Sequence, residues 1–427
     1  MPTEFDSTAK TGQLLQAICQ KLQFICKNLN YRIIKRGKAQ PAFSEILAEV
    51  ADDMQLRTLF MTFSYSQPVE VTFGAGARAE LAAVMRRHGL SRGILVADAS
   101  LVANGRAEEI MRSAVLVALF DGFGANPDIT AADKAAETAK KLGADCVVGL
   151  GGGSAMDLAK FTALVAKSGK SAEELFYGTL PDEALPVIAM PATAGTGSEV
   201  TGVSVMSDAA RGAKKPLTSP AFFATAAIVD PELTFTVPPF VTAASGLDAI
   251  AHALEAYWCK KHNPICDALA EKALKLLFGS MEKAYKDGGD ICARNDMSLG
   301  ALTAGLAFAP TRTAAVHACS YPLSEIYHLS HGEACAFTLD LFTKLNAQYD
   351  NDRMTALAVA LGFGTPEKMA EEIARLKKVT GMRAGLGEIG CADVRGLAEA
   401  CAAHPLMQNN TVAFSADELE KAFGGLK

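Results

Sequence analysis

Asp248 and His252 are the residues of this chain whose types and spacing most directly indicate chemistry. They are four positions apart in a segment whose apolar residues recur at helical spacing, so both side chains would share one face of a helix. A carboxylate and an imidazole placed in this way form part of a ligand set for a divalent first-row metal such as iron, zinc or manganese. Taken alone, the pair would more often be a surface ion pair.

Two further histidines, His317 and His331, favour the metal interpretation. The chain has only 7 His in 427 residues, and His317, His328 and His331 fall within 15 positions. Histidine is a common ligand of the same metals. We expect His328 to be a pocket or surface residue rather than a fifth ligand.

A glycine-rich segment, Gly151–Ser154, follows an apolar run at 146–150 and precedes a helix expected to begin near Ala155. Glycines at a strand-to-helix junction let the backbone approach a phosphate, and the helix N-terminus offers free N–H groups and partial positive charge. The segment fits neither the GxGxxG dinucleotide pattern nor the GxxxxGK[ST] nucleotide loop. The alternative is a tight turn that binds nothing.

Three segments together resemble the iron-dependent (group III) alcohol dehydrogenases. They are GLDAIAHALEAY (246–257), GGGSAMDLAK (151–160) and PATAGTGSEVT (191–201), and the resemblance extends over about residues 68–425. It implies a metal held by Asp248, His252, His317 and His331. Three histidines and one aspartate do not discriminate iron from zinc, so iron is expected on the family alone.

The resemblance also implies a set of residues that bind NAD(P). The glycine loop would bind the pyrophosphate, and two threonines would belong to a second cofactor loop. The expected set is Gly151, Gly152, Gly153, Ser154, Asp157, Thr193, Thr196, Asn126, Val205 and Lys215.

Asp98 bears on the choice between NAD and NADP. It ends an expected strand, where a carboxylate can accept hydrogen bonds from the adenosine ribose and repel a 2′-phosphate. We therefore add Asp98 to the cofactor-binding set and expect NAD. The alternative role of Asp98 is to cap the helix that follows.

The implied reaction exchanges a hydride between the nicotinamide and the carbon of a short-chain primary alcohol or aldehyde, with the metal as a Lewis acid. We expect His317 and Tyr321 to be catalytic. Many family members carry a histidine at the position of Tyr321, so the role of that histidine does not transfer intact. The Ser-Tyr feature resembles the 4-hydroxybutyrate dehydrogenase branch and is shared with enzymes that act on phosphonoacetaldehyde.

A substrate with an anionic end would need a cation or a hydrogen-bond donor in the pocket, because burying an unpaired carboxylate is costly. The candidates near the motifs are Lys260, Lys261, Arg312, Tyr321 and His328.

The elements that must position these residues alternate between strand and helix from residue 68 to about 240. Strands are expected at 69–73, 93–97, 113–120 and 146–150, and helices at 76–87, at 130–142 and from about 155. This alternation predicts a parallel sheet with helices on its faces, and the pattern after residue 240 is helical. We predict an α/β dinucleotide-binding domain at 64–238 and an all-α metal-binding domain at 239–427, an arrangement like that of dehydroquinate synthase.

Residues 1–63 lie outside the resemblance and are expected to form a helical extension of unknown role. Apolar residues between 14 and 29 recur at helical spacing, and a basic segment follows at 32–38. A transit peptide, a mobile arm and a start codon placed too far upstream, with Met61 as the true start, are alternatives. A secretory signal is not expected, because no continuous apolar core follows a basic start.

Composition excludes several classes of protein. The net charge of −6, without a basic block, gives no support to nucleic-acid binding. No apolar run reaches the length of about 18 residues that spans a bilayer. The ten cysteines are scattered, which predicts reduced thiols and a cytoplasmic location. We expect Cys259, Cys319 and Cys335 to be small core residues rather than ligands.

We expect a small-molecule alcohol or aldehyde as the substrate and a homo-oligomer, a dimer or larger. The alternatives are a generalist short-chain alcohol dehydrogenase, a zinc glycerol dehydrogenase, a metal-dependent lyase or cyclase on the same scaffold, and a binding protein without catalysis.

Overall fold

A computed structural model of the chain describes residues 62–426, and the residues from Tyr65 onward belong to one compact unit. The extension expected at 1–63 lies outside the described residues except for its last two positions. No helix among the described residues is both long and apolar enough to cross a membrane.

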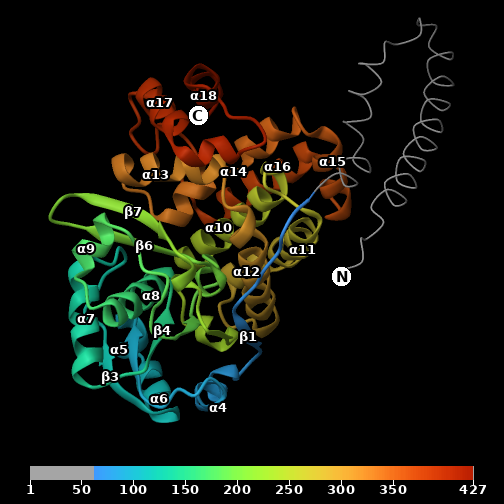
Figure 1. Ribbon diagram of the computed structural model, residues 1–427. Helices are drawn as coiled ribbons and strands as arrows, with labels where there is room; N and C mark the ends of the chain where they lie inside the picture. The colour runs from blue at the N-terminus through green and yellow to red at the C-terminus, as the bar shows by residue number, and fades with distance from the viewer. Residues whose placement is uncertain (1–61, 427) are drawn as a thin grey trace, which may run out of the picture. The chain divides into compact units, whose positions relative to one another are not determined.

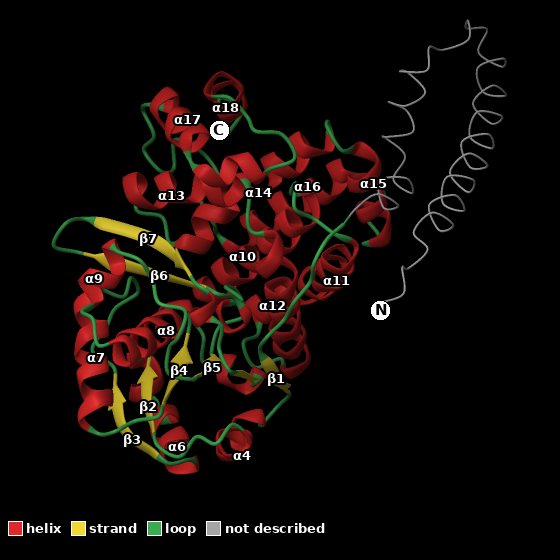
Figure 2. Cartoon of the chain, in the orientation of Figure 1, coloured by secondary structure: helices red, strands yellow, loops and turns green. Residues whose placement is uncertain are grey.

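A six-stranded parallel sheet forms the first half of this unit (Figures 1 and 2). Its strand order is β1-β8-β5-β4-β2-β3, and every pairing in it is parallel. The strands are β1 (Glu70–Phe73), β2 (Gly93–Ala97), β3 (Leu116–Phe120), β4 (Cys146–Gly151), β5 (Val187–Pro191) and β8 (Ala226–Val229). The central strands β2, β4 and β5 are buried along their whole length, as expected for a parallel sheet that is covered on both faces.

Helices cover both faces of the sheet, because side chains alternate along each strand. Ile94 and Val96 pack into one core with α7 (Ile129–Lys141), α8 (Gly153–Ser168) and α9 (Ala172–Tyr177). Leu95 and Ala97 face the other core, with α4 (Leu81–Arg87) and α6 (Arg106–Ser113). The predicted α/β fold is therefore confirmed.

The expected bounds of β1, β2 and β4 are close to the observed ones, whereas β3 begins at Leu116 rather than at 113, because α6 continues to Ser113. Several observed elements were not among the expected ones: the strands β5 and β8, the helices α6 and α9, and an antiparallel hairpin of β6 (Val203–Asp208) and β7 (Ala213–Thr218).

The second half of the unit is helical, as predicted. It contains α10 (Pro239–Trp258), α11 (Pro264–Lys286), α12 (Ile291–Thr311), α13 (Ala315–Tyr327), α14 (His331–Ala347), α15 (Asn351–Ala360), α16 (Pro366–Thr380), α17 (Val394–Ala403) and α18 (Ala416–Phe423). The helix α10 is at its centre, and every residue of α10 from Gly246 to Trp258 is buried (Figure 1). The predicted boundary at 238/239 falls just before α10, and the independence of the two halves as domains stays a prediction.

Candidate metal and cofactor site

The helix α10 carries Asp248 and His252 one turn apart in the interior of the helical half. The side chains of Asp248 and His252 are 2% and 5% exposed, which is unusual for an ionisable pair. The alternative interpretation, a surface ion pair, is therefore wrong, because the residues of α10 on both sides of the pair are buried.

One oxygen of Asp248 is the point on which three imidazoles converge. Asp248 Oδ1 lies 3.8 Å from His252 Nε2, 3.4 Å from His317 Nε2 and 3.7 Å from His331 Nε2. His317 comes from the first turn of α13 and His331 begins α14, so three helices supply the four side chains. Residues 83 positions apart in sequence, Asp248 and His331, are thereby brought into contact.

Two buried polar atoms in this cluster have no hydrogen-bond partner in the described part of the chain, although buried polar atoms normally have one. Asp248 Oδ1 and His317 Nε2 are buried and have no hydrogen-bond partner among the described residues. A buried polar atom without a partner costs about 1–3 kcal/mol, and more when it is charged. A divalent cation between them would satisfy both atoms, so these residues fit a metal site.

The protonation states of the cluster differ from one imidazole to the next. Burial alone would raise the pKa of the Asp248 carboxyl, but His252, His331 and His317 together hold it well below its usual range. Burial lowers the pKa of His252 to about 3, which keeps its imidazole neutral. Burial also opposes protonation of His317, but Cys335, Glu255 and Asp248 raise its pKa well above the usual value, and Cys335 and Asp248 raise that of His331. Metal binds ionised carboxylates and neutral imidazoles, so a cation here would displace the protons of His317 and His331.

Glu255 orients His317 and was not predicted. It lies on α10 one turn after His252, and its Oε2 lies 2.5 Å from His317 Nδ1. Its Oε1 accepts hydrogen bonds from the backbone N–H groups of Val316 (2.6 Å) and His317 (3.3 Å). When Nδ1 carries the proton donated to Glu255, the lone pair of Nε2 points at the cluster. The spacing of Glu255 from Asp248 and His252 within the motif was the available signal.

Cys335, expected from the sequence to be a small core residue rather than a ligand, is a second neighbour of the cluster. It follows His331 by one turn of α14, and its Sγ lies 3.9 Å from His331 Nε2. Its sulfur and the donor atoms of Asp248, His317 and His331 all lie within 4.8 Å of one another. Cys259 and Cys319 are buried in the helical core, whereas Cys335 belongs to that core and also borders the ligand set.

The glycine loop lies at the carboxyl end of β4, where α8 begins. Gly151 has a φ of 149°, and a Cβ at this position would lie 2.2 Å from Asp98 Oδ2. A Cβ on Gly153 would lie 2.9 Å from Thr196 Cγ2. Both glycines are therefore required by close packing, and α8 directs its N-terminal backbone N–H groups from this loop.

Asp98 ends β2 as predicted, but its side chain faces the glycine loop. Its Oδ2 accepts a hydrogen bond of 2.7 Å from the backbone N–H of Gly152, and it makes no capping bond to α5 (Ala99–Ala103). Burial raises the pKa of Asp98, whereas the bond from Gly152 lowers it. The capping alternative is not observed, and binding of the ribose by Asp98 stays a prediction.

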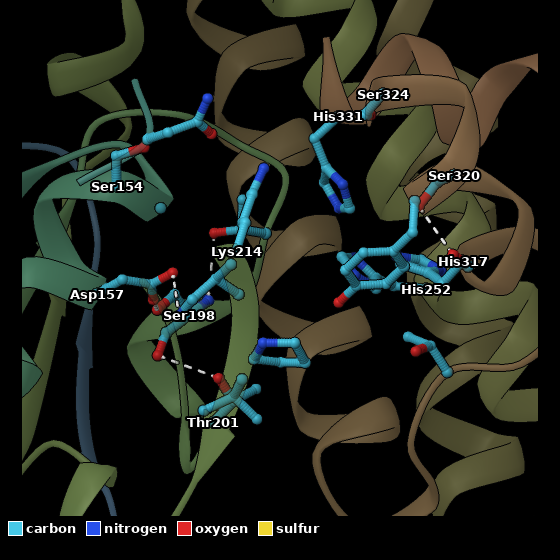
Figure 3. Close-up of a pocket in the computed structure, with 18 of the residues that line it drawn as sticks. Ser154, Asp157, Ser198, Thr201, Lys214, His252, His317, Ser320, Ser324 and His331 are labelled. Carbon is cyan, nitrogen blue, oxygen red and sulfur yellow. Dashed lines mark hydrogen bonds between the residues drawn. The ribbon is translucent and has the colours of Figure 1, made fainter. Parts of the chain in front are cut away.

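A cavity of about 510 Å³ joins the glycine loop to the histidine cluster (Figure 3). From the sheet half it is lined by Asn126, Gly153, Ser154, Asp157, Thr196 and Val205, all members of the expected cofactor set. From the helical half it is lined by His252, Arg312, His317, Tyr321 and His331. Figure 3 shows Ser154 and Asp157 on one side, the three histidines on the other, and Lys214 between them. Gly151, Gly152, Thr193 and Asp98 are not among the lining residues, and Thr193 packs behind Gly152.

The expected cofactor residue Lys215 is not among the residues that line the cavity, whereas its neighbour Lys214 is. Side chains alternate along β7, and Lys214, Pro216 and Thr218 line the cavity. Lys215 Nζ lies 4.5 Å from the ring centroid of Phe176 instead. Binding of the cofactor by Lys215, expected from the resemblance, stays a prediction, and the structure favours Lys214.

Asp157 braces the wall of the cavity. Its Oδ1 accepts from Ser198 Oγ at 2.7 Å and its Oδ2 from the backbone N–H of Val205 at 3.0 Å. Beside it, the buried Lys160 Nζ donates to the carbonyls of Ser198, Thr201 and Val203. Ser198 and Lys160 were quoted in the motifs without a role, and the structure shows that they hold the second loop against α8.

Tyr321 lines the cavity on α13, and its ring stacks on His404 with centroids 4.5 Å apart. Burial raises the pKa of Tyr321, so the phenol is protonated at neutral pH. Of the other candidates for an anionic end, Arg312 lines the cavity, whereas Lys260, Lys261 and His328 do not. His328 is exposed and ends α13 in the left-handed region, with a φ of 57°.

Comparison with known proteins decides the family. The model described as "Iron-containing alcohol dehydrogenase" matches residues 68–231, and that described as "Fe-containing alcohol dehydrogenase family, C-terminal" matches residues 242–424. The chain belongs to the iron-containing alcohol dehydrogenases. This result confirms the resemblance drawn from the three sequence segments.

Individual relatives of this iron-containing alcohol dehydrogenase differ in their substrates. Long-chain-alcohol dehydrogenase 1 of Geobacillus thermodenitrificans is 36% identical over 76% of this chain and 83% of that protein. Sulfoacetaldehyde reductase of Bilophila wadsworthia is 34% identical over 65% of this chain and 73% of that protein. The crystal structure of sulfoacetaldehyde reductase from Bifidobacterium kashiwanohense in complex with NAD+ has a TM-score of 0.83 and 39% identity, and the match covers 86% of this chain and 99% of that one.

Proposed function

We propose that this iron-containing alcohol dehydrogenase transfers a hydride between NAD(H) and a short-chain primary alcohol or aldehyde. One observation carries the proposal: a single cavity is lined by the glycine loop on one side and by the convergent histidines on the other. A dinucleotide on the loop and a substrate oxygen at the histidines would then be neighbours, as hydride transfer requires.

The residues divide the work between binding and orientation. Asp248, His252, His317 and His331 would hold the ion, and Glu255 keeps His317 Nε2 directed at it. Iron, when bound there, supplies a Lewis acid that stabilises negative charge on the substrate oxygen.

The glycine loop and the start of α8 would bind the pyrophosphate of NAD, and Lys214 would add a positive charge on the facing hairpin. The protonated phenol of Tyr321 is a hydrogen-bond donor on the substrate side of the cavity.

For the substrate, we propose a short aldehyde or alcohol with an anionic far end. The resemblance around Tyr321 suggested 4-hydroxybutyrate and succinic semialdehyde, and two relatives act on sulfoacetaldehyde, which carries a sulfonate. Carboxylate and sulfonate make the same demand on the pocket, a positive charge with hydrogen-bond donors. The 4-hydroxybutyrate assignment and the cytoplasmic location stay predictions.

An NADH-linked assay tests the proposal on the full chain loaded anaerobically with Fe²⁺. Butyraldehyde, succinic semialdehyde, sulfoacetaldehyde and phosphonoacetaldehyde are compared by kcat/KM, with NADPH as the cofactor control. We expect stoichiometric oxidation of NADH with at least one aldehyde. A lyase or cyclase would turn over without net change in NADH, and no oxidation with any of the four would refute a short-chain aldehyde as substrate.

A further inference from the structure

Arg312 adopts a backbone conformation that residues other than glycine rarely adopt. It follows α12 with φ 67° and ψ 169°, and only His328 among the described non-glycine residues also has a positive φ. This region of φ/ψ space is almost confined to glycine and is strained for a residue that carries a side chain. Such strain persists where the surrounding structure fixes it, and it is concentrated at functional sites.

The hydrogen bonds around Arg312 fix this conformation. Its backbone N–H donates to the carbonyl of Phe308 at 2.7 Å. Asn409 Nδ2 donates to the carbonyls of Thr311 and Thr313, both at 3.0 Å, and so holds the residues on either side. These hydrogen bonds hold the backbone between α12 and α13 in place, so the Cα and Cβ atoms of Arg312 have fixed positions.

The guanidinium of Arg312 has no counter-charge. Its side chain lines the cavity, and no described residue makes an ion pair or hydrogen bond with it. Burial lowers its pKa, with no carboxylate acting in the opposite direction. A partly desolvated guanidinium with five unused donors is costly unless a ligand supplies the acceptors.

Lys214 lines the same cavity but, unlike Arg312, has carboxylates near its charge. Burial lowers its pKa, but the carboxylates of Glu325 and Asp157 act in the opposite direction. Lys214 also comes from the sheet half, which carries the glycine loop. It suits the cofactor side, whereas Arg312 is the uncompensated charge of the helical side.

Arg312 is also near two residues of the histidine cluster's surroundings in the sequence. Phe308, one helical turn earlier, stacks on His252 with ring centroids 4.1 Å apart. His317 follows five positions later, in the first turn of α13. Arg312 and the three histidines also line the same cavity, so one ligand in it can meet both.

We propose that Arg312 binds the anionic end of the substrate and sets the preference for charged over neutral aldehydes, an inference that rests on the proposed function. A guanidinium matches the two oxygens of a carboxylate or a sulfonate with paired N–H donors. The strained backbone conformation of Arg312 holds these paired N–H donors at a fixed position.

The test compares Arg312→Gln and Arg312→Lys with the unmodified enzyme, using butyraldehyde, succinic semialdehyde and sulfoacetaldehyde. We expect Arg312→Gln to lower kcat/KM for the anionic aldehydes by roughly 10- to 100-fold, as for loss of a charge-assisted hydrogen bond, and to change butyraldehyde less than about threefold. Arg312→Lys should recover part of the preference for anionic aldehydes.

Lys261→Gln, at an exposed position outside the cavity lining, is the matched control. It should leave the ratio of kcat/KM for anionic over neutral aldehydes unchanged. The anionic aldehyde whose kcat/KM falls more in Arg312→Gln, succinic semialdehyde or sulfoacetaldehyde, identifies the anionic end of the substrate as carboxylate or sulfonate.

Arg312→Gly separates binding from structure. It removes the charge and also the backbone strain, so it should raise Tm by a few degrees while abolishing the preference for anionic aldehydes. A purely structural Arg312 would instead lower Tm and affect all three aldehydes equally, which overturns the inference.

The two proposals fail in different ways. If the unmodified enzyme oxidises NADH with butyraldehyde as efficiently as with the anionic aldehydes, the role of Arg312 and the anionic substrate class are refuted, whereas hydride transfer between NAD(H) and a short-chain aldehyde stands. If it oxidises NADH with none of the three, the proposed function fails first.

Discussion

At the scale of single residues, the site combines one buried negative charge with imidazoles whose orientation is set from outside. Asp248 provides the charge, and its Oδ1 is approached by three Nε2 atoms. Glu255 acts only through His317, since its oxygens are bonded to the ring and to two backbone N–H groups. Cys335 Sγ lies within 4.8 Å of the donor atoms of Asp248, His317 and His331, a grouping that does not include His252.

This arrangement predicts a graded loss of metal. We expect His317→Ala to abolish metal binding, Glu255→Gln to weaken it by about 10- to 100-fold through the loss of orientation, and Cys335→Ala to retain one equivalent. Metal analysis after dialysis, with circular dichroism to confirm folding, measures all three. Retention of a full equivalent by His317→Ala, or its loss in Cys335→Ala, would redefine the ligand set.

Asp248 and His252 could be paired from sequence because they are one helical turn apart, whereas His317 and His331 joined the expected ligand set through the resemblance to the family. Glu255 is on the same helix face as His252, but many such glutamates are only solvated surface residues, so its role required the position of α13. The strained backbone of Arg312 had no signal at all, because arginine gives no indication of a positive φ and Asn409, which helps to fix it, is nearly 100 residues away.

At the scale of elements, the β6–β7 hairpin shows the limit of reading a sequence by periodicity. The strands around the sheet are apolar runs with clear ends, whereas β7 reads Ala-Lys-Lys-Pro-Leu-Thr and contains a proline. Proline is accepted there because the two-stranded sheet leaves β7 with a free edge. An element that is not recognised leaves the direction of its side chains undefined, so the sequence could not show that Lys214 rather than Lys215 lines the cavity.

The hairpin predicts opposite outcomes for two adjacent lysines. Lys214→Gln should raise the Kd for NADH about tenfold or more, because it removes a charge that faces the cofactor side of the cavity. Lys215→Gln should leave this Kd within about twofold, because its Nζ lies over Phe176. Fluorescence titration with NADH measures both, and equal effects would contradict the observed alternation.

At the scale of the whole molecule, the cavity is assembled from residues between Ala125 and Leu406, which span most of the described chain. The fold class was predictable because each half has a uniform pattern, alternating strands and helices in one and helices in the other. The cavity itself was not, because it depends on how α10, α13 and α14 meet the carboxyl ends of the strands.

The uneven burial of the proposed metal ligands has a consequence for the order of assembly. The side chains of Asp248, His252 and His317 are about as buried as core residues, whereas that of His331 is 45% exposed and faces the cavity. We expect an ion to enter and leave past His331, through the cavity in which we propose that the dinucleotide binds.

Metal would then have to load before NADH, and bound NADH should slow the release of metal to a chelator several-fold. Following metal release to excess EDTA with and without saturating NADH measures this, and equal release rates would indicate another route. In a cell, a coenzyme that blocks this path would also protect the iron from exchange with competing metals.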